Sequence, residues 1–242
     1  MSEPATGEPT GPEVSGGRSI VLALTSPREA FEALAAKPVF SFALLALVVL
    51  GVAAVTIGFS KIVPEDYLRI IEESGREIPP EMAENPELLM SIARWGTIVG
   101  VAVFLPITYF AVAGIYLLAL RLAGSDLRYR QSLSVTVHGM LPMAVASVVG
   151  IVISLTRDRI DPLELQGGAI VMSNLGFLAE EGTSNAMRAV LTSVDLFSAW
   201  CIVLLALGYR IVGRVSAAAA WTTVVVVWIA GVAIKVAMAS MG

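Results

Sequence analysis

Two apolar runs near the C-terminal end, residues 194–216 and 217–239, restrict the possible folds more than any other feature. Asp195 lies at the start of the first run, and Arg210 and Arg214 lie at its end. Each run is about long enough to cross the roughly 30 Å hydrocarbon core of a bilayer. Only the seven residues 210–216 connect the apolar parts of the two runs. Because this connection is so short, we predict an antiparallel transmembrane hairpin.

The rest of the chain continues this pattern. The sequence is 56% hydrophobic and only 15% charged, against about 25% charged residues in an average soluble domain. We therefore predict an all-α, polytopic helical membrane protein with five transmembrane helices and short amphipathic surface helices. The predicted spans cover about residues 39–60, 96–120, 133–155, 189–209 and 217–239.

The N-terminal part divides into two predicted regions. Residues 1–19 are rich in Gly and Pro and have the composition of a disordered tail. Residues 20–240 form the predicted membrane domain. The stretch Ser26–Glu29 has the form of a capping box, and Phe31 and Leu34 fall on one face of the helix that follows. We expect this helix to lie at the membrane surface; the alternative is a helix in solution.

Two long connections carry most of the acidic residues. Residues 61–95 predict two short amphipathic helices, broken at Pro79-Pro80, that cover the membrane surface. Residues 157–188 include an apolar stretch, Ala169–Ala179, which is too short to cross a bilayer and predicts a re-entrant or interfacial segment.

The short connections are basic, which favours one orientation. Residues 121–132 and 210–216 together carry five Arg and one acid, whereas the two long connections carry seven bases and 13 acids. Short basic connections remain on the cytoplasmic side. We therefore predict a multi-pass protein with its N-terminus inside and its C-terminus outside. A preference for Ala, Val, Gly and Arg over Lys suggests the cytoplasmic membrane of a prokaryote.

Four residues inside the spans are candidates for an intramembrane polar or structural role: Asp195, His138, Pro142 and Trp200. Asp195 falls six residues into the predicted span 189–209. We predict that it forms hydrogen bonds within the bundle or caps a helix; the alternative is an ion or proton pathway.

The other three candidates are expected to be structural. Pro142 has no N–H for the carbonyl of His138, so the third span is predicted to kink there. His138 is interpreted as a packing residue on the opposite side of the membrane from Asp195, and a direct pair is not expected. Trp200 is interpreted as an anchor or packing residue. Lys235 is expected to extend to the interface.

Motifs of enzymes are missing from the sequence. It contains one His and one Cys, and it has no metalloprotease, nucleophile-elbow, P-loop or dinucleotide motif. We therefore predict no enzymatic activity, no catalytic residue, no cofactor and no metal site. The absence of a basic patch argues against nucleic-acid binding.

Several short motifs, in order and spacing, resemble the Yip family of five-span membrane proteins (Ypt/Rab-interacting), in its prokaryotic form. These are Ser26-Pro27 with Phe31, Arg130-Gln131-Ser132, His138-Gly139-Met140-Leu141-Pro142, Asp195 to Trp200 with Gly208, and Arg214 with Ser216-Ala217. The resemblance covers about residues 20–240. It implies a five-helix domain with a cytoplasmic N-terminus and no established enzymatic activity. In eukaryotic members it implies small GTPase partners, but the short tail here has no recognisable partner motif.

Two functions follow as hypotheses. The first is a membrane-organising or scaffold protein that acts through contacts with the lipid bilayer or with other membrane proteins, including a second copy of itself. The alternative is a small transporter or channel subunit with an intramembrane polar site at Asp195. It is suggested by that acid together with Pro106 and Pro142, because broken helices often border transport pathways.

Overall fold

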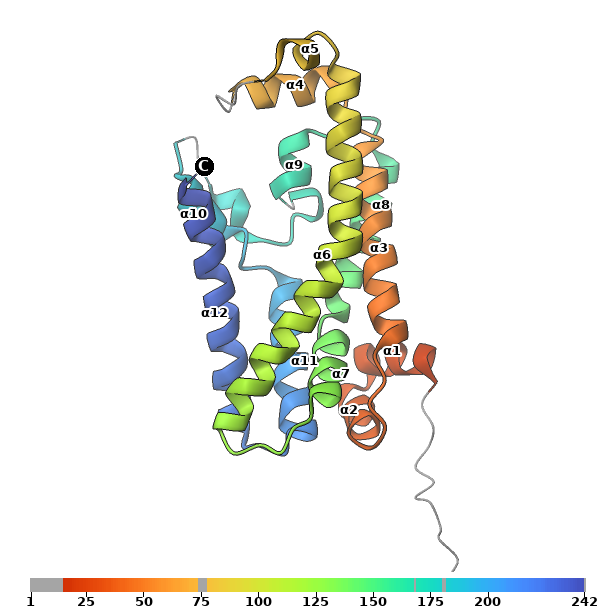
Figure 1. Cartoon of the computed structure of the whole chain (residues 1–242), viewed down its shortest axis with the longest axis vertical. Coiled ribbons are helices and arrows are strands. Elements are labelled where there is room, and N and C mark those ends of the chain that lie inside the picture. The colour runs from red at the N-terminus through yellow and green to blue at the C-terminus, as the bar shows by residue number, and fades with distance from the viewer. Residues whose placement is uncertain (1–14, 74–77, 168, 180–181, 242) are drawn as a thin grey trace, which may run out of the picture.

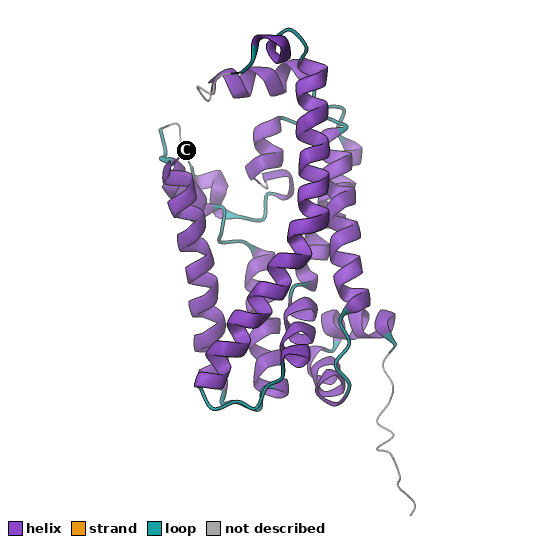
Figure 2. Ribbon diagram, viewed as in Figure 1, coloured by secondary structure: helices purple, strands orange, loops and turns teal. Residues whose placement is uncertain are grey.

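The computed structural model describes residues 15–73, 78–167, 169–179 and 182–241, and each regular element in them is a helix (Figures 1 and 2). The all-α prediction is therefore confirmed. Four stretches are long and apolar enough to cross a membrane: α3 (Ser41–Phe59), α6 (Pro86–Leu122), α7 (Tyr129–Gly139) joined to α8 (Leu141–Thr156), and α12 (Ala217–Met241).

The predicted span at residues 189–209 is wrong in its bounds. The short helix α10 (Asn185–Leu191) ends first, and four residues separate it from α11 (Leu196–Val212). The side chains between them turn back to the backbone: Thr192 Oγ1 donates to the Arg188 carbonyl at 2.9 Å. Such side chains compete with the helical ladder. At 17 residues, α11 is shorter than the four candidate spans, so a fifth span is not evident from length.

The second span is longer than predicted. Its helix begins at Pro86 rather than near residue 96 and extends for 37 residues. Asn85 starts it by accepting a hydrogen bond from the Leu88 N–H at 3.1 Å, and proline is well suited to the first helical position. The apolar residues near Leu88 therefore belong to α6. Its extension meets α4 (Pro64–Glu73) and α5 (Pro80–Ala83) at one end of the molecule (Figure 1).

Two helices, α1 (Gly16–Thr25) and α2 (Pro27–Ala36), precede the first span. The last residues of the predicted tail, 16–19, are thus helical, and residues 1–14 lie outside the described part. Helix α2 begins where predicted, but Ser26 makes no side-chain capping bond. Its apolar face packs on the bundle, because Phe31 is completely buried.

One end of the bundle, which we call the packed end, is closely filled. It is formed by α1, α2, α7, the C-terminal half of α6 and the C-terminal part of α11. Phe31 of α2 lies so close to Gly208 of α11 that a Cβ on the glycine would be 2.8 Å from the ring. The Tyr209 hydroxyl lies 2.7 Å from Thr136 Oγ1 and 3.0 Å from Ser132 Oγ. Buried polar groups of α7 and α11 thus satisfy one another.

The third span is interrupted where Pro142 predicts it. Helix α7 ends at Gly139 and α8 begins at Leu141, with Met140 between them at φ −91° and ψ 0°. Met140 N–H still donates to the Thr136 carbonyl at 3.1 Å. The missing proline N–H thus breaks the helix without separating its two halves.

The opposite end, which we call the open end, holds short elements. These are α4, α5, α9 (Pro162–Gly167), the 3-10 turns η1 (Ala169–Val171) and η2 (Leu175–Leu178), and α10. An ion pair joins α4 to the connection between α8 and α9: Arg159 Nε donates to Asp66 Oδ2 at 2.7 Å. The Arg159 guanidinium lowers the pKa of the Asp66 carboxyl through this bond.

Candidate functional site

Asp195 is the N-cap residue immediately before α11, not a residue within a helix as the predicted span implied. One carboxylate oxygen, Oδ1, accepts from the Phe197 N–H at 2.8 Å and from the Ser198 N–H at 3.0 Å. The other, Oδ2, accepts from the Ser198 hydroxyl. Two otherwise unpaired N–H groups of the helix end are thereby satisfied, and the positive end of the helix dipole faces the acid.

The irregular segment before Asp195 is held by a second irregular segment. Leu175 N–H donates to the Val194 carbonyl at 3.2 Å, and Leu196 N–H donates to the Ser173 carbonyl at 3.3 Å. These two hydrogen bonds pair backbone groups of non-helical segments. Inside a membrane, non-helical backbone persists only where protein or a cavity surrounds it.

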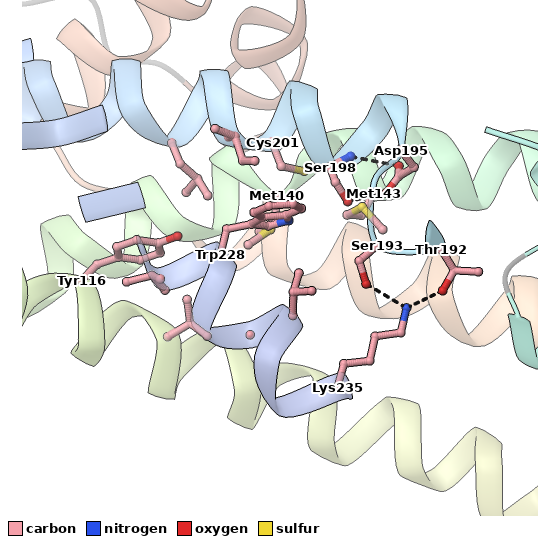
Figure 3. A pocket seen from close by; sticks show the side chains of 16 residues that line it. Tyr116, Met140, Met143, Thr192, Ser193, Asp195, Ser198, Cys201, Trp228 and Lys235 are labelled. Atoms are coloured by element: carbon pink, nitrogen blue, oxygen red, sulfur yellow. Dashed lines mark hydrogen bonds between the residues drawn. The ribbon is translucent and has the colours of Figure 1, made fainter. Parts of the chain in front are cut away.

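Lys235 of α12 joins this site. Its ammonium donates to Thr192 Oγ1 at 2.9 Å and to Ser193 Oγ at 3.1 Å, and its side chain points toward the connection before α11 (Figure 3). The expectation that Lys235 extends to the interface stays a prediction, to which the structure adds these two contacts. The two hydroxyls give their own protons to backbone carbonyls and offer lone pairs to the lysine.

Two cavities of about 400 Å³ each meet at this site. Both are lined by Asp195, Thr192, Lys235 and Met143. We call the first the wedge cavity, because it lies between α6 and α12, which are close at one end and diverge toward the other (Figure 1). It is lined by Val112, Tyr116, Met140, Met143, Thr192, Ser193, Asp195, Ser198, Cys201, Ile202, Leu205, Val227, Trp228, Gly231, Val232 and Lys235.

The lining of the wedge cavity is apolar except at one end. Trp228, Cys201 and Met140 lie along its wall, and the hydroxyls, Asp195 and Lys235 are gathered at the end near the start of α11 (Figure 3). A volume of about 400 Å³ is within the range of small-molecule sites, about 300–1,000 Å³. The arrangement can therefore hold an elongated apolar group that ends in a polar one.

His138 belongs to the packed end and lines a different cavity, of about 250 Å³. Its Nδ1 lies 2.9 Å from the Ser134 carbonyl, so Nδ1 carries a proton. Its Nε2 lies 2.9 Å from Ser19 Oγ of α1. The structure therefore does not bring His138 to Asp195. Instead it links the histidine to the N-terminal helix.

The remaining candidates also lie away from the cavity. Pro142 is buried in the first turn of α8, and Trp200 is half-buried and packs against the hydrophobic core around Phe31. Trp228, which the sequence did not distinguish from the other tryptophans, lines the cavity instead. In the described residues, no three His, Cys, Asp or Glu side chains are placed to hold a metal ion.

Sequence reasoning missed Lys235 and the hydroxyl pair Thr192-Ser193 as site residues. A signal was present for each. Lys235 is the one charged residue in the predicted span 217–239, and an ionisable residue inside a span marks a candidate site by default. The hydroxyl pair precedes Asp195 by two residues, a composition that favours a helix start over a helix interior.

Comparison with known proteins gives two findings. The family model of the Yip1 domain matches residues 21–238. Over 208 residues the chain is 24% identical to "Membrane protein YknW" of Bacillus subtilis (strain 168), a match that covers 85% of this chain and 83% of that protein. No solved structure matches the chain.

Proposed function

The chain belongs to the Yip1 domain family, and from this premise we propose that it is a non-enzymatic, membrane-organising protein. It acts through contacts with other membrane proteins or with lipids, and the wedge cavity is where those contacts are made. The observation that carries the proposal is a partly enclosed apolar cavity between two candidate spans, α6 and α12. A cavity in that position is reached sideways, from within the membrane.

The burial of the spans supports this role. Only 11% of the most apolar window of α6 is buried inside the protein, and the value for α12 is also 11%. The corresponding value for the span formed by α7 and α8 is 28%. The two helices that border the wedge cavity therefore present most of their apolar surface to whatever surrounds the bundle.

Five crossings with the N-terminus inside and the C-terminus outside fit this arrangement. Helices α1 and α2 lie at one end of the molecule, and the C-terminal end of α12 lies at the other (Figure 1). We propose that α11, about 25 Å long at 1.5 Å per residue, is the fifth crossing. This helix begins, after Asp195, deeper than the ends of the neighbouring spans. The short helix α10, which packs beside α12, occupies the remaining thickness of the membrane. A reporter fused after Gly242 is expected on the outer side of a prokaryotic cytoplasmic membrane.

Photo-crosslinking in native membranes tests the proposed contacts. A benzophenone side chain placed at Val232 faces the wedge cavity, whereas the same group at Ile229 lies on the exposed surface of α12. We expect discrete protein or lipid adducts from Val232 and only diffuse bulk-lipid labelling from Ile229. Adducts with a differently tagged copy would identify a homo-oligomer. Equal and diffuse labelling at both positions would contradict the proposal.

A second function, a small transporter or channel subunit, is favoured by one observation. The chain is non-helical between α10 and α11, and Asp195 borders both large cavities there. Against a continuous pathway, His138 lines a separate cavity at the packed end. Purified protein in vesicles, tested with a panel of ions and small solutes, distinguishes the two functions. Flux that is lost in Asp195→Asn, with normal assembly, would favour transport.

A further inference from the structure

We propose that the wedge cavity binds a membrane lipid with an anionic head group, whose acyl chain lies against Trp228 and whose acidic group pairs with Lys235. This inference rests on the proposed function, because it names one class of contact made at the same site. It depends on three features of the cavity: its lining, its opening and its single cation.

The lining fits a hydrocarbon chain. Between Tyr116 at one end and Ser198 at the other, the wall consists mainly of aliphatic, aromatic and sulfur-containing side chains. In Figure 3 the indole of Trp228 lies across this wall, between Tyr116 and the polar end. A chain of methylene groups transferred from water to such a wall is stabilised, but a lipid chain already in the membrane gains little of this. Selectivity must therefore come from the polar end.

The polar end has a donor to spare. The Lys235 ammonium has three N–H groups, and two of them are used by Thr192 and Ser193. Within the described residues the third has no protein acceptor. A cation with an unused N–H donor beside an apolar cavity is stabilised by a hydrogen-bond acceptor. An anionic acceptor is favoured, because the surroundings contain little water.

Asp195, the other charged residue of the cavity, does not fill this role. Its two oxygens accept from two backbone N–H groups and one hydroxyl of α11, and the dipole of that helix favours the negative charge. The lysine donates to the hydroxyls that precede the acid rather than to the acid itself. The carboxylate is thus engaged with its own helix, and the lysine remains the group that selects the ligand.

The depth of Lys235 fits a lipid head group better than a dissolved anion. It lies six residues before Met241, the last residue of α12, which is about 9 Å along the helix axis. Groups at the boundary between head groups and acyl chains lie about 5–10 Å below the surface. The cavity is only partly enclosed and is lined by residues of the candidate spans α6 and α12, so a lipid is expected to enter between these two helices without leaving the bilayer.

Fluorescence quenching by brominated lipids tests the proposal. A variant in which Trp228 is the one remaining tryptophan, with Trp95, Trp200 and Trp221 changed to Phe, is placed in nanodiscs of phosphatidylcholine. Brominated phosphatidylglycerol or brominated phosphatidylcholine is then added at increasing fractions. We expect the anionic lipid to occupy the site about fivefold more favourably, the factor that corresponds to roughly 1 kcal/mol per lysine near a membrane surface.

Two substitutions and one control position complete the test. Lys235→Gln is expected to abolish the preference, and Lys235→Arg to keep it. The same measurement on a variant that retains only Trp221, which is on α12 but outside the cavity, is expected to be unaffected by Lys235→Gln. Thermal unfolding of each variant shows that it is folded before it is compared.

The outcomes are distinct. Equal quenching of Trp228 by both lipids, or a preference that persists in Lys235→Gln, would overturn the lipid proposal. If the preference is absent but Val232 still forms discrete protein adducts, the organising function stands and only the lipid assignment fails. If Val232 forms lipid adducts but no protein adducts, and the preference depends on Lys235, the cavity is a lipid site and the protein contacts fail.

Discussion

The packed end and the open end of the bundle are both built from apolar helices, but the helices pack closely only at the packed end. At the packed end, Phe31 and Tyr209 are completely buried and a glycine at 208 lets two helices touch. At the open end, Gly231 of α12 has no atom within 4 Å of the position of an added Cβ. Apolar composition alone therefore places a helix in the membrane; close packing additionally requires a partner shaped to fit.

This difference teaches where function is expected. A closely packed interior loses stability with even small changes in volume. The open end keeps two cavities and gathers its charged and hydroxyl side chains around them. We interpret the packed end as the part that holds the bundle together, and the open end as the part that meets other molecules.

The largest contrast is expected from one substitution made on two helices. Phe31→Ala removes a ring that is completely buried, and should lower the free energy of unfolding by about 3–5 kcal/mol. Phe104→Ala removes a ring that is 66% exposed on α6, and should cost well under about 1 kcal/mol. Thermal and denaturant unfolding in detergent measure both. Equal losses would show that α2 does not pack as described.

A smaller contrast is expected from two glycines. An added Cβ at Gly208 would lie 2.7 Å from Val135 Cγ1, so Gly208→Ala forces the helices apart. We expect a loss of about 1–2 kcal/mol, because overpacking outweighs the gain in helix propensity. Gly231→Ala meets no neighbour and should stabilise by about 0.5–1 kcal/mol. A stabilised Gly208→Ala would refute the close approach of α2, α7 and α11.

The sequence predicted the helical class and the positions of three spans because apolar length is a local property. It also predicted the break near Pro142, since a missing N–H has the same consequence in any fold. It placed the start of α6 ten residues too late, because residues 86–95 follow a run of acidic residues and were assigned with them to a solvated loop. In the structure, α6 also packs on the short helix α4.

The site could be predicted only in part, because it depends on contacts between distant segments. Asp195 was identified from its charge within an apolar run, but its position at a helix start depends on where α10 ends. Lys235 contacts Thr192, 43 residues earlier in the chain, and no local pattern encodes that pairing. The separation of His138 from Asp195 was predicted, since it follows from the alternation of span directions.

Two tyrosines in contact give the next contrast. The rings of Tyr116 and Tyr209 lie 4.8 Å apart, but their hydroxyls differ. The Tyr209 hydroxyl bonds to Ser132 and Thr136, so Tyr209→Phe should cost about 1 kcal/mol. Tyr116 lines the wedge cavity, and its hydroxyl has no protein partner among the described residues. Tyr116→Phe should therefore leave the unfolding midpoint unchanged; a loss equal to that of Tyr209→Phe would place both hydroxyls in one network.

The smallest effect is expected from the ion pair at the open end. Arg159 donates to Asp66 and lowers the pKa of that carboxyl below its ordinary value. A carboxyl with a lowered pKa in the folded state stabilises the fold above its unfolded pKa, and this contribution is lost as the pH falls through the folded value. The pair is exposed and screened by salt, so it should contribute little.

We therefore expect Arg159→Gln to lower the unfolding midpoint slightly at pH 7. The difference from the wild type should shrink as the pH falls below about 4 and disappear below the lowered pKa of the Asp66 carboxyl. Unfolding curves of both proteins at several pH values, at low and high salt, measure it. Arg28→Gln is the matched control, because Arg28 pairs with Glu32 on the exposed face of α2 and not with the open end. If Arg159→Gln shifts the midpoint as strongly as Gly208→Ala does, then the surface helix α4 holds the open end closed, and the division between a packed and an open end would have to be redrawn.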